Sequence, residues 1–338
     1  MSSKVKIIAE VGINHNGNIS KAKKLIDIAK EAGADYVKFQ SYITENLLNR
    51  YEPLMKYQRF NIKRKINQFE MLKKFELSFL DQIQIKKYCK KKKINFLSTP
   101  YDIDSVKNLI KMNLRTFKIG SSDCNNVLMI NYLLKRNKKI ILSTGCTNEQ
   151  ELNNILKKVS YLKYKNKIIL MHCTSFYPAP VNTLNLSVIQ NFAKKFNLTP
   201  GYSDHSSSLI TGALAVQFGA KFIEKHITLN KNNFGPDHKA SLEPKEFKEY
   251  IKNIRFAEKA IGKPKKKIMI IEKPIKRKMQ KSIYISNELK KGSILKENML
   301  ILKRPNDGIS ALNVYKIINR KINKDLKKNH KISFKDLS

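Results

Sequence analysis

The chain has 338 residues, of which 41% are hydrophobic, and this predicts one large folded domain with a small one beside it. No run of about 18 apolar residues occurs, so no membrane span is expected, and the short, charged N-terminal stretch does not fit a secretory signal. The four cysteines are widely spaced without a CxxC or zinc pattern, which predicts reduced thiols and a cytoplasmic protein.

The formal net charge of +40 raises the alternative of a basic, non-catalytic protein that binds nucleic acid or another polyanion. The positive residues are mostly lysines, with nine arginines, and they are spread along the chain rather than gathered in a tail. Lys, Asn and Ile have A/T-rich codons, so genome composition accounts for much of the charge. We therefore expect a solvated surface and no nucleic-acid partner, while the charge still attracts anionic substrates.

Eight short apolar, β-rich runs recur along residues 1–262, and segments with apolar residues three and four positions apart separate them. The predicted strands are residues 7–12, 36–40, 95–100, 116–121, 139–144, 168–173, 199–204 and 222–228. The helical segments include residues 21–32, 105–112, 148–158 and 209–218. Eight alternating strands and helices predict an α/β fold of the TIM (β/α)8 barrel type. A doubly wound sheet is the alternative, but no GxGxxG follows the first strand.

Polar side chains end most of these predicted strands. They are Glu10, Lys38 with Gln40, Ser98 with Thr99, Lys118 with Ser121, Ser143 with Thr144, His172, Asp204 with His205, and Glu224 with His226. The active site of a TIM barrel is built at the C-terminal ends of its strands. The pattern therefore predicts one site at the mouth of the barrel.

The pattern changes after Gly262. Residues 263–281 are dense in lysine and contain Pro264 and Pro274, which predicts a linker. Residues 282–338 read as short strands and turns. The predicted organisation is a barrel over residues 1–262, a linker over 263–281 and a small domain over 282–338.

Nine motifs, in order along the chain, resemble the signatures of the sialic-acid synthase family, which includes N-acetylneuraminate, legionaminate and spore-coat polysaccharide synthases. They are IAEVGINHNG at 8–17, ADYVKFQ at 34–40, FLSTP at 96–100, FKIGS at 117–121, ILSTG at 141–145, HCT with Tyr177-Pro178 at 172–178, GYSDH at 201–205, IEKH at 223–226 and GPDHKASLEP at 235–244. The C-terminal segment, including Lys303-Arg304-Pro305, resembles the antifreeze-protein-like (SAF) domain of these synthases.

The resemblance implies a phosphoenolpyruvate-dependent transferase that condenses this substrate with an N-acylated amino sugar and water, giving a nonulosonic acid and phosphate. N-acetylmannosamine is the preferred acceptor, giving N-acetylneuraminate. Its 6-phosphate and 2,4-diacetamido-2,4,6-trideoxymannose, which gives legionaminate, are alternatives. A sugar-phosphate aldolase on the same barrel, with a Schiff-base lysine, is another enzymatic alternative.

His205 and His226 end consecutive predicted strands, and neutral imidazole is a good ligand for a first-row metal. The residues alone leave open whether each is instead a packed barrel residue. The resemblance implies that the two histidines hold a divalent cation, Mn2+ or Mg2+, and act in catalysis with Glu10 and Glu224. Glu10 is the candidate for proton handling, and Glu224 shares a strand face with His226.

Lys38 and Lys118 lie inside apolar strands, where a buried ammonium needs a bound anion or a carboxylate partner. A salt bridge to a strand-end glutamate is the alternative to a bound anion. The resemblance implies a phosphoenolpyruvate site made of Lys38, Thr99, Lys118, Ser121 and Ser203.

For the sugar, the resemblance implies contacts from Gln40, Asp123, Tyr177, Asp237 and Arg304, the last reaching the partner's site in a domain-swapped homodimer. The sequence departs from the family pattern near these residues. Ser122-Asp123 replaces the frequent Gly-Glu, Asn306-Asp307 replaces Gly-Asn after Arg304-Pro305, and Ser175-Phe176 replaces the common Asn before the Tyr-Pro pair. The metal and phosphoenolpyruvate positions are unchanged, so these departures bear on the identity of the sugar.

Overall fold

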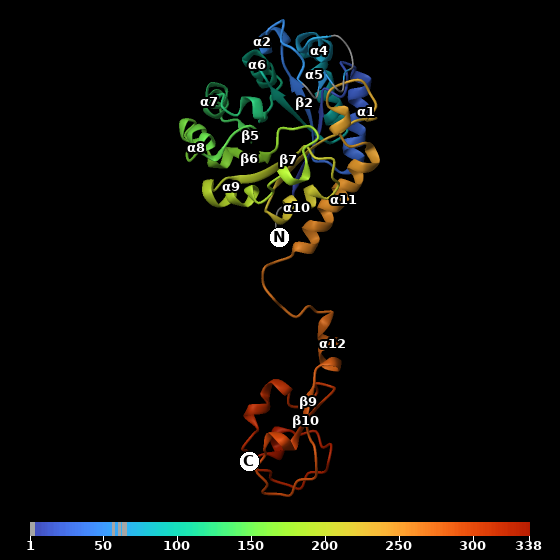
Figure 1. Cartoon of the computed structure of the whole chain (residues 1–338), viewed down its shortest axis with the longest axis vertical. Coiled ribbons are helices and arrows are strands. Elements are labelled where there is room, and N and C mark those ends of the chain that lie inside the picture. Colours follow the sequence, from blue (N-terminus) through green and yellow to red (C-terminus); the bar gives the residue numbers. More distant parts are fainter. Residues whose placement is uncertain (1–3, 56–57, 60–61, 63–65) are drawn as a thin grey trace. The chain divides into compact units, whose positions relative to one another are not determined.

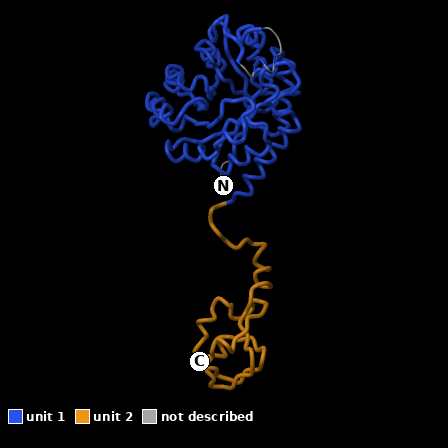
Figure 2. Tube along the Cα trace, in the orientation of Figure 1, with its two compact units in different colours: residues 1–262 blue, residues 263–338 orange. Residues whose placement is uncertain are grey.

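The computed structural model describes residues 4–55, 58–59, 62 and 66–338. They form two compact units, one extending to Gly262 and the other from Lys263 to Ser338, which Figure 2 shows in different colours. No helix among the described residues is long and apolar enough to cross a membrane.

The first unit is built on an eight-stranded parallel sheet with the strand order β3-β2-β1-β8-β7-β6-β5-β4. The strands at the two ends of this order, β3 and β4, also contact each other, so the sheet curls into a near-closed barrel (Figure 1). Its strands are β1 (Lys6–Gly12), β2 (Tyr36–Ser41), β3 (Asn95–Pro100), β4 (Thr116–Ile119), β5 (Lys139–Ser143), β6 (Ile168–Cys173), β7 (Thr199–Asp204) and β8 (Phe222–His226). The predicted TIM-type barrel is confirmed.

Helices surround this sheet, as Figure 1 shows. In the first unit they are α1 (Ile19–Ala32), α2 (Thr44–Leu47), α4 (Gln68–Phe75), α5 (Phe79–Lys91), α6 (Ile103–Lys111), α7 (Val127–Lys135), α8 (Glu149–Lys158), α9 (Val188–Phe196), α10 (Thr211–Gln217) and α11 (Pro244–Ile261). Several begin at side-chain caps, for example Asn18 on α1 and a capping box of Asn148 with Glu151 on α8. These caps satisfy backbone N–H groups that the first turn leaves without partners.

Alternation along the strands divides the core into two layers. One face packs against the helices, and the other fills the barrel with Ile8, Leu97, Ile141, Ile169 and Met171. Two positions further along the strands, on the same face, come the polar residues Glu10, Thr99 and Ser143. The apolar cluster thus forms a floor beneath polar side chains at the C-terminal ends of the strands.

The second unit pairs two antiparallel strands, β9 (Ser282–Ile285) and β10 (Leu300–Lys303), over a small core that includes Ile283, Leu295 and Ile332. Residues 263–281, predicted as a linker, are exposed throughout. They contain the helix α12 (Glu272–Met279), which the sequence analysis did not predict. Pro274 lies in its first turn, where proline is tolerated because those N–H groups lack helical partners anyway.

Candidate functional site

A cavity of about 570 Å³ opens at the C-terminal ends of the barrel strands. Twelve of the predicted site residues line it, namely Glu10, Lys38, Gln40, Thr99, Lys118, Ser121, Tyr177, Ser203, His205, Glu224, His226 and Asp237. Asp123 and Arg304 are not among its lining residues. The structure therefore brings twelve of the fourteen predicted site residues together in one cavity.

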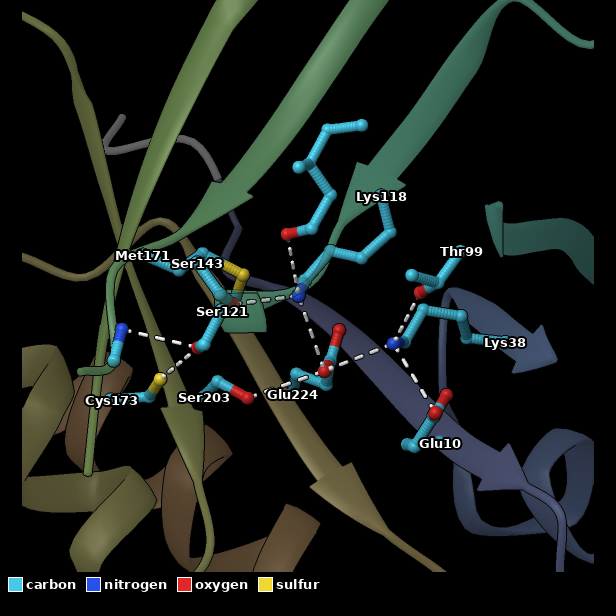
Figure 3. A network of polar contacts seen from close by, with 12 residues as sticks. Glu10, Lys38, Thr99, Lys118, Ser121, Ser143, Met171, Cys173, Ser203 and Glu224 are labelled. Carbon is cyan, nitrogen blue, oxygen red and sulfur yellow. Dashed lines mark hydrogen bonds and ion pairs between the residues drawn. The ribbon is translucent and has the colours of Figure 1, made fainter. Parts of the chain in front are cut away.

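Lys38 lies at the centre of a buried network drawn in Figure 3. Its Nζ is 3.2 Å from Glu10 Oε1 and 3.3 Å from Glu224 Oε1. It also donates a hydrogen bond of 3.0 Å to Thr99 Oγ1. Burial alone would lower the pKa of Lys38, but Glu10 and Glu224 outweigh it, so that the pKa is raised and the side chain stays charged.

Lys118 approaches the same oxygen of Glu224 from another direction (Figure 3). Its Nζ donates to Ser143 Oγ at 2.6 Å and lies 3.7 Å from Glu224 Oε1. Burial lowers the pKa of Lys118, and Glu224 offsets this only in part. The side chain is therefore a buried ammonium with incomplete compensation, which an anion bound in the cavity would relieve.

The two glutamates of the network have opposite pKa shifts. Burial raises the pKa of Glu10 to about 7, against the attraction of Lys38. Burial also acts to raise the pKa of Glu224, but Lys118 and Lys38 together hold it below its usual value. Glu10 can therefore exchange a proton near neutral pH while Glu224 stays ionised, which suits Glu10 to proton transfer.

His205 and His226 face each other across one side of the cavity, with ring centroids 5.7 Å apart. His205 Nδ1 lies 2.8 Å from the carbonyl oxygen of Thr174, which can only accept, so Nδ1 carries the proton. Nε2 of the neutral ring is then an acceptor, with the hydroxyl oxygens of Tyr177 and Ser203 at 3.2 and 3.3 Å. Burial lowers the pKa of His205 to about 4 and that of His226 well below its usual value. Both rings are thus neutral at physiological pH, the form that binds metals.

The donor set at this wall fits a divalent cation with open positions. In the described part of the chain, four buried side-chain atoms have no hydrogen-bond partner, and three of them belong to residues that line this cavity: His226 Nδ1, Glu10 Oε2 and Glu224 Oε2. No group of three or more His, Cys, Asp or Glu side chains there forms a metal site by itself. Two imidazoles would therefore leave the remaining coordination positions to substrate and water.

Three polar side chains converge around Gly12, whose φ of +53° lies in the left-handed region that favours glycine. A Cβ atom there would lie 3.3 Å from Glu10 Oε1, 3.4 Å from Gln40 Nε2 and 3.6 Å from Asp237 Oδ2. Burial raises the pKa of Asp237 to about 6. Gln40 and Asp237 thus form a hydrogen-bonding edge beside Glu10, as expected for residues that hold a polyhydroxylated substrate.

Two predicted residues lie elsewhere. The carboxylate of Asp123 accepts hydrogen bonds from Ser122 Oγ and Asn126 Nδ2, both at 3.1 Å, so it organises the turn after β4. Arg304 is exposed in the second unit, at the end of β10. The sugar contacts expected of Asp123 and Arg304 remain predictions.

Other residues of this cavity were not predicted from the sequence. Ser143 accepts a hydrogen bond from Lys118 but was noted only as a hydroxyl at the end of a predicted strand. That position was the one sign in the sequence that Ser143 belongs to the site. The apolar part of the lining includes several residues between Tyr42 and Leu72, a stretch in which no strand or helix was predicted. Its members include Ile13, Tyr42, Leu47, Leu48, Met55, Met71, Leu72, Tyr101 and Phe176.

Comparison with known proteins agrees with this geometry. The NeuB family matches residues 25–266, and the SAF domain matches residues 280–338. The N,N'-diacetyllegionaminic acid synthase of Campylobacter jejuni is 41% identical over 330 residues, covering 97% of this chain and 99% of the relative. The N-acetylneuraminate-9-phosphate synthase of Homo sapiens is 34% identical over 298 residues, covering 88% of this chain and 82% of the relative.

A solved structure shares both sequence and fold with the chain. The N-acetylneuraminic acid synthetase from Leptospira borgpetersenii serovar Hardjo-bovis, in complex with citrate, has 31% sequence identity and a TM-score of 0.70. The match covers 81% of this chain and 90% of that chain.

Proposed function

The chain belongs to the NeuB family of synthases, and we propose that it condenses phosphoenolpyruvate with the aldehyde of an N-acylated amino sugar to give a nonulosonic acid and phosphate. The observation that carries this proposal is the pair of buried lysines, Lys38 and Lys118, on either side of Glu224 at the barrel mouth. Phosphoenolpyruvate offers a phosphate and a carboxylate, two anionic groups for two ammonium groups. A neutral substrate would leave Lys118 poorly compensated.

Hydroxyl groups complete the phosphoenolpyruvate site in this proposal. Thr99 and Ser143 already bond to the two lysines, and Ser121 and Ser203 lie in the same cavity. They would donate to phosphate and carboxylate oxygens while the lysines offset the charge. The assignment keeps the predicted residues Lys38, Thr99, Lys118, Ser121 and Ser203 and adds Ser143.

His205 and His226 would hold Mn2+ or Mg2+, which when bound would polarise the aldehyde oxygen as a Lewis acid. C3 of phosphoenolpyruvate then forms the new bond to the aldehyde carbon. Water adds to C2, and phosphate leaves with cleavage of the C2–O bond, which gives the 2-keto acid. Glu10 exchanges a proton with the reacting oxygens, and ionised Glu224 fixes the two lysines and Ser203.

The acceptor sugar is the finer part of the proposal. Gln40, Tyr177 and Asp237 would bind its hydroxyl and amide groups. The apolar lining from residues 42–72 suits a sugar with a C6 methyl group better than one with a 6-phosphate. Together with the 41% identity to a diacetyllegionaminic acid synthase, this favours 2,4-diacetamido-2,4,6-trideoxymannose over N-acetylmannosamine, which reverses the preference drawn from the sequence.

The proposed assembly is a homodimer in which the second unit places Arg304 over the partner's cavity. The segment that contains α12 supports a partner, because Ile271 at its N-cap and Ile275 and Met279 within it recur every four residues and are 76%, 49% and 54% exposed. Such an apolar stripe is costly in water unless another surface covers it. A cytoplasmic location accords with four free cysteines.

The test is phosphate release from phosphoenolpyruvate with manganese present, across N-acetylmannosamine, its 6-phosphate and 2,4-diacetamido-2,4,6-trideoxymannose. We expect release with the trideoxy sugar, and none after a chelator has removed the metal. Release with N-acetylmannosamine alone would keep the reaction and refute the sugar. A folded protein that releases phosphate with none of the three would contradict the proposed reaction.

A further inference from the structure

A fully buried ion pair joins β7 to β8 on the face opposite the cavity. Lys225 Nζ lies 3.1 Å from Asp204 Oδ2, and both side chains have zero exposure. Asp204 and Lys225 are also register partners in the parallel ladder, so the pair crosses the two strands at one level. The strand-end pattern had grouped Asp204 with the barrel mouth, but alternation turns it outward, toward the helices.

Asp204 is held by an unusually complete set of donors. Its Oδ2 accepts from Tyr250 Oη at 2.8 Å and from Thr211 Oγ1 at 2.5 Å. Its Oδ1 accepts from the backbone N–H and the hydroxyl of Ser206, at 2.9 and 2.7 Å. The pair therefore ties β7 and β8 to the first residue of α10 and to the middle of α11.

The helix α10 is shaped to admit Tyr250. A Cβ atom on Gly212 would lie 2.5 Å from both Cζ and Oη of Tyr250, so any larger residue would displace the ring. Glycine in a helix costs about 0.5–1 kcal/mol relative to alanine. Its presence here marks the close approach of Tyr250 as a requirement of the packing.

The two members of the pair are the chain neighbours of the two histidines. Asp204 precedes His205, and Lys225 precedes His226. The pair also fixes Ser206 on the other side of His205, because Asp204 accepts from its N–H and Lys225 donates to its carbonyl oxygen. The backbone that carries His205 is therefore clamped both before and after the histidine.

We propose that the Asp204–Lys225 pair, with Tyr250, is a positioning element that sets the separation and orientation of His205 and His226 for a divalent cation. The inference rests on the proposed function, in which these histidines hold the metal. A buried ion pair is a poor source of stability, since apolar replacements of similar size often do as well. What an apolar pair would lack is the directional contact with Ser206 that fixes the loop carrying His205.

The phosphoenolpyruvate side of the cavity offers an internal comparison. Lys38, Thr99 and Lys118 come from β2, β3 and β4, which the pair does not touch. Of the residues proposed to bind phosphoenolpyruvate, only Ser203, on β7, is next to a member of the pair. Loosening the pair is therefore expected to weaken metal binding while phosphoenolpyruvate binding changes little. A general loss of folding would affect both.

The experiment measures the affinity of the metal-free, full-length chain for Mn2+ and for phosphoenolpyruvate by titration calorimetry, with thermal melting alongside. Tyr250→Phe removes the hydroxyl that donates to Asp204, and Lys225→Met removes the cation that pairs with Asp204. Tyr88→Phe is the matched control, because it removes a hydroxyl that donates to Asp27 at 2.9 Å between α5 and α1. We expect Mn2+ affinity about tenfold lower in Tyr250→Phe and lower still in Lys225→Met, with phosphoenolpyruvate affinity within twofold of the wild type in Tyr250→Phe and in the control.

Unchanged Mn2+ affinity in a folded Tyr250→Phe variant overturns the inference, as does an equal loss in the Tyr88→Phe control. Tyr250→Phe decides the question alone where Lys225→Met does not fold. Phosphate release by the wild type is recorded separately. A wild type that turns over, with unchanged Mn2+ affinity in Tyr250→Phe, refutes the positioning role and leaves the proposed function standing.

Discussion

Lys38 and Lys118 both approach Glu224, yet their surroundings give opposite expectations for stability. Lys38 is the ion-pair partner of Glu10 as well as of Glu224, so Lys38→Met would leave a buried carboxylate without its cation. Lys118 is poorly compensated, and Glu224 would keep Lys38 and Ser203 after Lys118→Met. We expect Lys38→Met to destabilise the fold by about 3 kcal/mol or more, and Lys118→Met to leave the melting temperature unchanged or higher.

Both lysine variants should lose function, and this separates binding from folding. We expect Lys118→Met to lower kcat/KM for phosphoenolpyruvate by about 100-fold or more, because an ammonium facing the anion is gone. Differential scanning fluorimetry and a phosphate-release assay on the same preparations give both quantities. A stable Lys38→Met variant together with an unstable Lys118→Met variant would contradict this view of the network.

Asp237 provides a prediction about pH. Burial raises its pKa from 3.8 to about 6, so the folded protein holds a proton that the unfolded chain loses. This contribution to stability is complete below pH 4 and is lost as the pH rises to about 6, a change of up to about 3 kcal/mol. Asp237→Asn has no carboxyl group at this position, so the variant does not lose this stability as the pH rises. The melting temperature of the variant minus that of the wild type should therefore rise between pH 4 and 6 and then level off.

Thermal melts at intervals from pH 4 to 8 measure this difference. Asp104→Asn, which removes a half-exposed carboxylate at the start of α6, is the control for loss of a negative charge from the barrel. A difference for Asp237→Asn that stays constant over the whole range would show that the carboxyl is not desolvated in the folded state.

At the level of single side chains, the sequence predicted which residue types meet but not all of their directions. Glu10, Lys38, His205 and Glu224 were placed correctly at the cavity because each lies within or directly after a strand of one parallel sheet. Asp204 was misplaced because adjacent residues of a strand point to opposite faces, and the motif alone does not say which one faces inward. Asn306 and Asp307, which differ from the family pattern, make side-chain hydrogen bonds to Gln280 and Lys331 respectively. These partners could not be predicted without the fold.

Among the structural elements, the turn after β5 has the least room for change. A Cβ atom on Gly145 would lie 2.0 Å from Ser175 Oγ, 2.7 Å from Ser121 Oγ and 2.8 Å from Cys173 Sγ. Gly145 also donates its N–H to Ser121 Oγ at 3.1 Å. Gly145→Ala should therefore destabilise the barrel by about 1–3 kcal/mol, through overpacking, and weaken phosphoenolpyruvate binding by displacing Ser121.

Gly120→Ala, directly after β4, is the matched control for Gly145→Ala. Its added Cβ would meet only ordinary contacts, at 3.6 Å from Ser122 Oγ and from Tyr101. Chemical denaturation gives the stability of both variants, and calorimetry gives phosphoenolpyruvate affinity. If Gly145→Ala were as stable as Gly120→Ala, the crowding of these side chains would not constrain the turn.

The strands could be predicted from the sequence because each is a short apolar run between helical segments. The errors lie at ends: the fourth strand stops at Ile119, since Ser121–Asp123 turns into a 3-10 helix instead of extending the sheet. The eighth stops at His226, before Thr228. No strand or helix was predicted between Tyr42 and Phe75, where the described apolar side chains belong to short elements such as α2 and α4 and form one cluster.

The organisation of the whole molecule makes a prediction about how two chains cooperate. In the proposed dimer each cavity takes its histidines from one chain and its Arg304 from the other. His205→Ala should abolish turnover and weaken metal binding while leaving the fold intact, and Arg304→Ala should impair use of the sugar. Each variant alone should therefore have little activity, for different reasons.

Mixing the two variants distinguishes a swapped dimer from independent chains. In a mixed dimer the intact cavity of the Arg304→Ala chain receives Arg304 from the His205→Ala chain, so one of its two sites is complete. If subunits exchange at random, half of the dimers are mixed, and the mixture should recover about a quarter of wild-type turnover. Co-refolding the two variants, confirming mixed dimers by mass spectrometry and measuring phosphate release tests this. Mixed dimers with no activity beyond that of the parents would mean that Arg304 serves its own chain or no site at all, and the exposed stripe on α12 would then need a different partner surface.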